Sequence, residues 1–254
     1  MKDVLLSTTY FGPVQWYQKL YRAEHVLIEQ WEHFEKQSYR NRCLIATTQG
    51  IQALTVPVER GNAQSSKLKA QSSKLKAQSS KLKAQTIKDI RISDHGNWRH
   101  LHWNALQSAY GESPFFDYYQ DDIRPFFEER WTYLIEFNEA IRAKMCELLD
   151  IQPRVSYTES WREECGGRSE ITSSAEYAGD TLPADYSPSS LHTPPSSKYL
   201  IDFRSSIHPK HPGADEAFEP RPYYQVYRQK HGFLPNLSIL DLLFNMGPEA
   251  IFYL

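Results

Sequence analysis

The chain has 254 residues, of which 40% are hydrophobic and 24% are charged, and its formal net charge is −2. This composition is typical of a soluble globular protein, and no run of 18 apolar residues indicates a transmembrane segment. Six lysines lie in a repeated segment, and without them the net charge falls from −2 to −8. Such an acidic remainder argues against a nucleic-acid partner.

The strands are expected mainly in the N-terminal part of the chain. Apolar and alternating patterns predict them at residues 4–6, 25–29, 39–46, 53–58 and 87–92, with a turn at Gln49-Gly50 between the third and fourth. Pro13 is predicted to open a helix that runs to about Arg22, because Val14, Tyr17 and Tyr21 fall on one face.

Helices are expected to follow. Asn97 is a candidate N-cap for a helix ending near Gly111, Pro114 begins a short aromatic helix, and residues 125–149 fit one long helix. Residues 199–203 read as a strand, 223–227 as a strand or a helix, and 238–246 as the last element. This order predicts an α/β fold in one domain over residues 1–254: an N-terminal mixed sheet covered by a C-terminal helical layer.

Two low-complexity segments interrupt the pattern. Residues 63–83 are three copies of Ala-Gln-Ser-Ser-Lys-Leu-Lys, and the insert 63–85 is predicted to be an exposed loop, because its apolar steps of two and five residues do not make a coiled coil. It is either a tolerated tandem expansion or a lysine-rich arm for an acidic partner or membrane surface. Residues 157–197, rich in serine and proline, are predicted to be a long loop excursion.

Several well-known functional signatures are missing from the sequence. It has no G-x-G-x-x-G, no Walker loop, no G-x-S-x-G elbow and no His-x-x-x-His pair, so we expect neither a cofactor nor a metal. Cys43, Cys146 and Cys165 form neither a disulfide framework nor a zinc pattern. Together with the lack of a signal peptide at the start of the sequence, this favours a reducing, cytoplasmic location.

The densest polar cluster surrounds two arginines. If residues 39–46 form a strand, Arg40 and Arg42 share one face and Asn41 lies on the other. Two guanidinium groups on one face suit a phosphate or a carboxylate. The alternative is a set of ordinary ion pairs with Glu29, Glu32 or Glu35.

Other candidates lie elsewhere in the chain. Tyr10 and Gln15 flank Gly12 where a strand leads into a helix, which is either a ligand position of the kind common in α/β proteins or an aromatic-rich helix start packed in the core. His102 is either a general base or a structural histidine. Asp202 and Arg204 either clamp an anion or pair with each other. Asp241 either completes a capping box with Ser238 or acts as a base.

Several ordered motifs together resemble those of the WbqC-like family. The motifs are Thr9-Tyr10-Phe11-Gly12-Pro13, Tyr39-Arg40-Asn41-Arg42, Asn97-Trp98-Arg99-His100-Leu101-His102-Trp103, Ser113-Pro114-Phe115-Phe116 and residues 236–248. The resemblance covers nearly all of the chain except the repeat and residues 157–197. It implies a part in bacterial surface-polysaccharide pathways such as O-antigen synthesis. It also implies that Tyr10, Gln15, Arg40, Asn41, Arg42 and Asp241 matter for function.

Two classes of function follow from the residues and the resemblance. The first is a group-transfer enzyme, a transferase acting on an activated or amino sugar. In such an enzyme, Arg40 and Arg42 would bind an anionic molecule such as a nucleotide sugar. The bound molecule would be oriented by Tyr10, Gln15 and Asn41. The general base would be His102 or Asp241. The alternative is a noncatalytic binding or scaffold protein that contacts enzymes of the same pathway.

Overall fold

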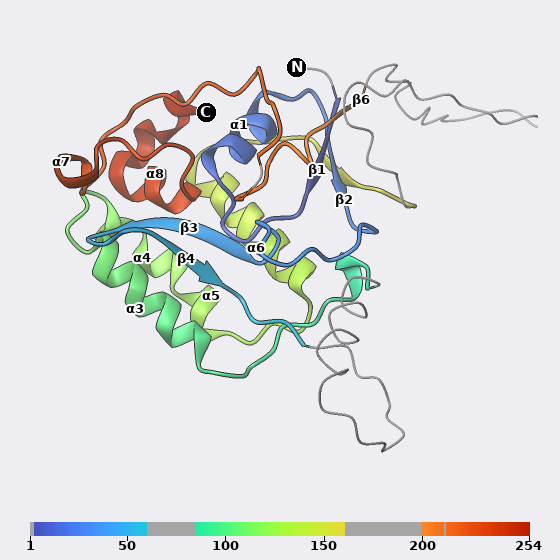
Figure 1. Cartoon of the computed structure of the whole chain (residues 1–254), viewed down its shortest axis with the longest axis horizontal. Coiled ribbons are helices and arrows are strands. Elements are labelled where there is room, and N and C mark those ends of the chain that lie inside the picture. The colour runs from blue at the N-terminus through green and yellow to red at the C-terminus, as the bar shows by residue number, and fades with distance from the viewer. Residues whose placement is uncertain (1–2, 60–84, 161–199, 211) are drawn as a thin grey trace, which may run out of the picture.

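The computed structural model describes residues 3–59, 85–160, 200–210 and 212–254 (Figure 1). The predicted loops at 63–85 and 157–197 lie outside the described residues, apart from Gln85 and residues 157–160.

Four short strands form a parallel sheet. They are β1 (Asp3–Ser7), β2 (Val26–Glu29), β5 (Val155–Tyr157) and β6 (Leu200–Asp202), and they lie in the order β5-β2-β1-β6. Val4 of the central strand β1 pairs with Val26 on one side and Ile201 on the other. Both faces of β1 are buried, which explains its run of apolar residues.

Helix α1 (Val14–Arg22) connects β1 to β2, and its side chains Trp16, Tyr17 and Leu20 are buried. From β2 the sheet continues to β5, whereas β6 is added on the opposite side of β1. The strand order therefore reverses between β1 and β6. In open α/β sheets, ligands bind outside the carboxyl ends of the strands at such a switch point.

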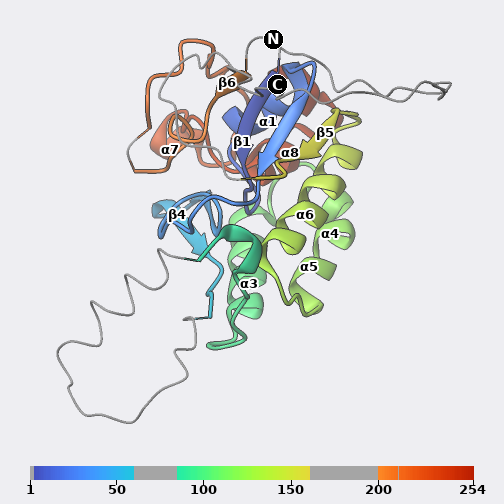
Figure 2. The same cartoon turned by 90° about the vertical axis from the view of Figure 1, so that its right-hand side faces the viewer.

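A separate antiparallel hairpin follows β2 along the chain. Its strands are β3 (Arg42–Thr47) and β4 (Gly50–Thr55), with Arg42 opposite Thr55. The α/β class is confirmed, but the expected single mixed sheet is instead a parallel sheet and this hairpin. Figure 2 shows the carboxyl ends of β1 and β2 pointing toward the hairpin and α3 (Trp98–Tyr110).

The remaining helices complete the described structure. They are α4 (Phe116–Ile123), α5 (Pro125–Glu128), α6 (Leu134–Leu148), α7 (Arg228–His231) and α8 (Ile239–Met246), with 3₁₀ turns at Ile87–Asp89 and Gly247–Tyr253. Buried side chains from the sheet, hairpin and helices form one hydrophobic cluster. In the described part of the chain, no helix has the length and apolar character needed to cross a membrane.

Two predicted elements are wrong for a shared reason. The helix expected at 125–149 is interrupted between α5 and α6, and the strand expected at 87–92 is a 3₁₀ turn followed by isolated bridges. The Ile92 amide donates to the Thr132 carbonyl, and the Leu134 amide donates to the Ile90 carbonyl. Because backbone groups of residues 90–92 and 132–134 hydrogen-bond to each other, neither segment continues as a regular strand or helix.

Smaller corrections concern boundaries and caps. The strand predicted from residue 39 begins at Arg42, the one predicted at 53–58 is Gly50–Thr55, and the turn before it is at Thr48-Gln49. Residues 223–227 form neither a strand nor a helix. Asn97 does precede α3, but its backbone is left-handed, with φ 49°, and its side chain makes no cap hydrogen bond.

Candidate functional site

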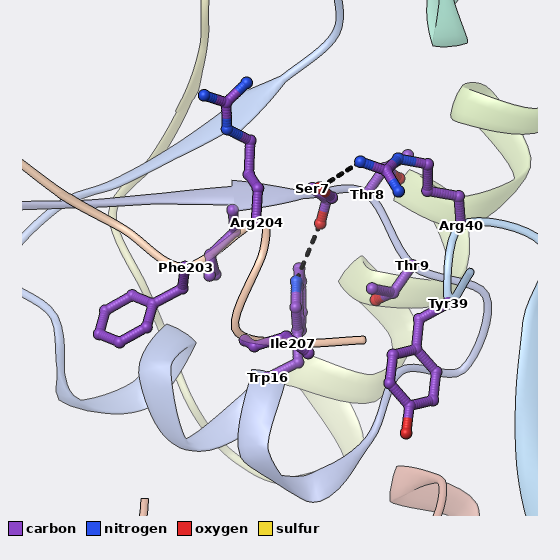
Figure 3. A pocket seen from close by; sticks show the side chains of 10 residues that line it. Ser7, Thr8, Thr9, Trp16, Tyr39, Arg40, Phe203, Arg204 and Ile207 are labelled. Atoms are coloured by element: carbon purple, nitrogen blue, oxygen red, sulfur yellow. Dashed lines mark hydrogen bonds between the residues drawn. The ribbon is translucent and has the colours of Figure 1, made fainter. Parts of the chain in front are cut away.

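A small hollow lies at the switch point, beside the ends of β1 and β6 (Figure 3). Its polar wall consists of residues 7–9 together with Arg40 and Arg204, and Trp16, Tyr39 and Phe203 are among its apolar lining. The empty space between the walls is about 240 Å³, but only about 10 Å³ can hold the centre of a water-sized sphere. That is room for a single water molecule.

Arg40 lies in the turn before β3 and is 4% exposed. Its Nε and Nη2 donate to both oxygens of Glu32, at 2.7 and 2.5 Å, and Nη2 also donates to Ser7 Oγ at 3.1 Å. At the rim its Nη1 lies 3.3 Å from the exposed Glu35. The ion pairs that the sequence offered as the alternative to an anion site are therefore present for Arg40. The bidentate geometry of its pair with Glu32 fixes the orientation of the guanidinium group.

Arg204 follows β6, and its side chain is fully buried. It pairs with Asp202, with Nη2 2.7 Å from Oδ2, and its Nη1 lies 3.8 Å from Oε2 of the fully buried Glu29. Of the two alternatives for Asp202 and Arg204, the structure therefore has them paired with each other. We call Ser7–Thr9, Glu29, Glu32, Arg40, Asp202 and Arg204 the switch-point cluster.

Three buried atoms of this cluster have no hydrogen-bond partner in the described part of the chain: Thr8 Oγ1, Thr9 Oγ1 and Glu29 Oε2. Glu29 Oε1, by contrast, accepts from the Trp31 amide at 2.8 Å and from Thr158 Oγ1 at 2.7 Å. Leaving a buried polar group unpartnered costs about 1–3 kcal/mol. Two of the three residues, Thr8 and Thr9, line the hollow, and Glu29 lies against Arg204, which also lines it. Buried atoms without partners beside a hollow mark a place where a bound molecule can supply the missing hydrogen bonds.

Among the residues proposed from the sequence, Arg40 and Arg204 line the hollow, whereas Tyr10, Gln15, Asn41, Arg42, His102 and Asp241 do not. Asn41 donates to the Val56 carbonyl at 2.8 Å, and Arg42 donates to Thr55 Oγ1 at 3.0 Å. Tyr10 is fully buried, and its hydroxyl contacts His102 Nδ1 at 2.9 Å. Arg40 and Arg42 do not share a strand face, because β3 begins only at Arg42.

The strand–helix junction at Gly12 and Gln15 is closed by the C-terminal part of the chain. The Val14 amide donates to the Leu237 carbonyl at 3.0 Å, and the Gln15 amide donates to Asn236 Oδ1 at 2.9 Å. The Gln15 side chain bonds Asn236 and Asp215. Gly12 allows close approach of Thr9, whose Oγ1 would lie 2.4 Å from a Cβ at that position. The start of α1 is therefore engaged by protein groups.

Asp241 is fully buried at the start of α8, away from the hollow. Its carboxylate accepts from Tyr110 at 2.9 Å, Tyr223 at 2.6 Å and Gln225 at 2.8 Å. Burial raises the pKa of Asp241, although these three donors act in the opposite direction. Ser238 caps α8 through the Leu240 amide, but the Asp241 side chain makes no reciprocal capping bond, so a full capping box is absent.

We expect His102 to make the stability of the protein depend on pH. Burial lowers its pKa from 6.5 to about 4. Between these values the unfolded chain binds a proton that the folded protein does not, so the free energy of unfolding falls as the pH decreases. The fall is about 3 kcal/mol in total. Urea unfolding from pH 7 to 4 measures it, and a His102→Gln variant should lack this component; an unchanged pH slope in the variant would contradict it.

Thr8 and Thr9 were not singled out from the sequence as site residues, and Glu29 and Glu32 were considered only as possible ion-pair partners of the arginines. One usable signal is that each lies at or just after the end of a short apolar strand, where parallel strands collect functional groups. Within the described residues, no group of three or more histidine, cysteine or acidic side chains could hold a metal ion.

The fold and the cluster define a class: an α/β protein with a buried polar cluster at the switch point of a parallel sheet. Comparison with known proteins agrees with the sequence motifs. The WbqC-like protein family matches residues 8–83 and 75–253, two stretches that overlap inside the repeat, and the chain belongs to this family.

One relative is described as the uncharacterized protein Rv1507c of Mycobacterium tuberculosis. The two sequences are 26% identical over 262 residues, which cover 100% of this chain and 98% of the relative. No solved structure matches the chain.

Proposed function

We propose that the chain is a cytoplasmic enzyme of bacterial surface-polysaccharide synthesis that transfers a group to or from an activated or amino sugar. The family resemblance supports the pathway, and the free, buried Cys43 and Cys146 fit a reducing compartment. One observation carries the assignment of the site: the buried hydroxyls of Thr8 and Thr9, which have no hydrogen-bond partner in the described structure, line a hollow at the carboxyl end of β1.

Sugar recognition fits the groups present there. The hydroxyls of Thr8 and Thr9 can each donate and accept, as sugar hydroxyls require, and Trp16 and Phe203 supply apolar wall. The carboxylate–guanidinium pairs hold one another in place, so the cluster is organised before a ligand arrives. The hollow has room for one water, so it can receive a single small group of a sugar, while the rest of the sugar lies outside it.

A Thr9→Val variant tests this proposal. It keeps the shape of the side chain but removes an unpartnered hydroxyl, so the ligand-free protein should be equally stable or stabilised by up to about 1 kcal/mol. Binding of nucleotide sugars should weaken at least tenfold. A thermal-shift screen against a panel of nucleotide sugars measures binding, and urea unfolding measures stability.

Arg42→Ala is the matched control, because Arg42 lies outside the hollow and the variant should bind as the wild type does. Equal ligand-induced shifts in the wild type and Thr9→Val would contradict the site. If no nucleotide sugar shifts the wild type, the enzyme proposal fails and the noncatalytic scaffold role is favoured.

A further inference from the structure

The switch-point cluster carries more negative than positive groups. The guanidinium groups of Arg40 and Arg204 stand against the carboxylates of Glu29, Glu32 and Asp202, an excess of one negative charge. At the rim, His208 lies 3.6 Å from Glu35. This pair is neutral when His208 is protonated, and it adds one more negative charge when His208 is neutral. The cluster is negative in both cases. The side chains of Glu29 and Glu32 are 0% and 1% exposed, where water screens their charge least.

The unpartnered atoms also favour a positively charged group over a phosphate. A carboxylate oxygen such as Glu29 Oε2 can only accept hydrogen bonds, whereas the threonine hydroxyls accept or donate. A phosphate group has only acceptors to offer, so it cannot provide the donor that Glu29 Oε2 lacks. An ammonium group has three donors and no acceptor, so it can donate to the hydroxyls of Thr8 and Thr9 in the hollow, and its charge is opposite to that of the Glu29 carboxylate.

Two features argue against a phosphate at this place. The guanidinium donors that face the hollow already bind carboxylates, with Arg40 held by Glu32 and Arg204 by Asp202. The amides at the start of α1, which bind phosphate in many α/β proteins, donate to residues 236–237 instead. A phosphate placed in the cluster would add negative charge to an already negative, buried site.

We infer that the part of the substrate bound in the switch-point cluster is a protonated primary amine, as on an amino sugar. This inference rests on the proposed function and narrows its substrate class. The ammonium group lies at Thr8 and Thr9 and offsets the excess charge of the neighbouring carboxylates, Glu29 among them. The phosphate groups of an activated sugar lie outside the cluster.

Calorimetric titration of the full chain at neutral pH with four sugars tests the inference. The sugars are glucosamine, N-acetylglucosamine, glucose and glucose 1-phosphate. Glucosamine should bind at least tenfold more tightly than glucose. N-acetylglucosamine, which has lost the charge, should show no such gain, and glucose 1-phosphate should bind more weakly than glucose.

A Glu29→Gln variant isolates the charge. Its amide oxygen can still accept from Trp31 and Thr158, so the fold should be retained, but the preference for glucosamine over glucose should fall below threefold. Glu139→Gln is the control, since Glu139 is a partly buried carboxylate that pairs with Arg142 outside the cluster, and it should keep the full preference. Circular dichroism and thermal melting verify that both variants fold.

The outcomes separate the inference from the proposed function. If glucose or glucose 1-phosphate binds as tightly as glucosamine, the amine assignment is overturned while a sugar-binding site remains. A glucosamine preference that survives in Glu29→Gln also overturns it. If none of the four sugars binds and the nucleotide sugars fail as well, both the inference and the proposed function fall.

Discussion

Replacing Arg40 with alanine should lower the free energy of unfolding by about 3–5 kcal/mol, because it leaves a buried carboxylate without its counter-charge. Glu32 is 1% exposed, and both of its oxygens accept from the Arg40 guanidinium group. Ser7 Oγ also loses the donor that reaches it from Arg40. Urea unfolding of the wild type and variant at neutral pH measures the difference.

Two further variants make this result specific. Arg42→Ala removes the same charge from a half-buried position, where Arg42 donates one hydrogen bond to the uncharged Thr55 hydroxyl, so we expect a loss below about 1 kcal/mol. A double variant, Arg40→Met with Glu32→Leu, removes both charges and should be more stable than Arg40→Ala alone. Equal losses in Arg40→Ala and Arg42→Ala would show that the pair with Glu32 contributes little.

Asp241→Asn should destabilise the fold by about 2–4 kcal/mol, through hydrogen bonds that an amide cannot reproduce. The carboxylate accepts from three buried donors, on Tyr110, Tyr223 and Gln225. An asparagine keeps one acceptor oxygen and turns an NH₂ group toward some of these donors. Chemical unfolding, read by circular dichroism, measures the loss.

The same variant distinguishes two roles for Asp241. A general base that contacts the substrate would lose turnover on substitution while stability stayed near that of the wild type. The fully buried position predicts the opposite, a loss of stability. Tyr223→Phe is the control, because it removes one donor and leaves the carboxylate two others, so its loss should be about 1–2 kcal/mol.

The local parts of the fold were predictable from the sequence, and the long-range parts were not. The apolar run before Ser7 and the proline at the start of the first helix predicted β1 and α1 closely. The break between α5 and α6 depends on hydrogen bonds with residues 90 and 92, which lie some 40 positions away in the sequence. The periodic apolar pattern of residues 125–149 gives no indication of these bonds. The separation of the hairpin from the parallel sheet is likewise a matter of tertiary pairing.

The site shows the same division. Arg40 stood out because charged residues crowd around it in the sequence, and Asp202 and Arg204 because they alternate on a strand. Thr8 and Thr9 are ordinary polar residues in the sequence. Their significance comes from lying 1% and 6% exposed beside a hollow with no hydrogen-bond partner in the described structure. Burial and missing partners are properties of the folded chain.

The closure of α1 by residues 236–238 makes the completion of the first βαβ unit depend on a segment that is synthesised much later. Ser238 Oγ donates to the Phe11 carbonyl across 227 positions, and the Gln15 amide reaches Asn236 across 221. The βαβ unit built from the first 29 residues therefore leaves the ribosome long before the groups that complete it. Until residues 236–246 have been synthesised, this nascent segment lacks these hydrogen bonds and its apolar cover from α8, and chaperones can bind it.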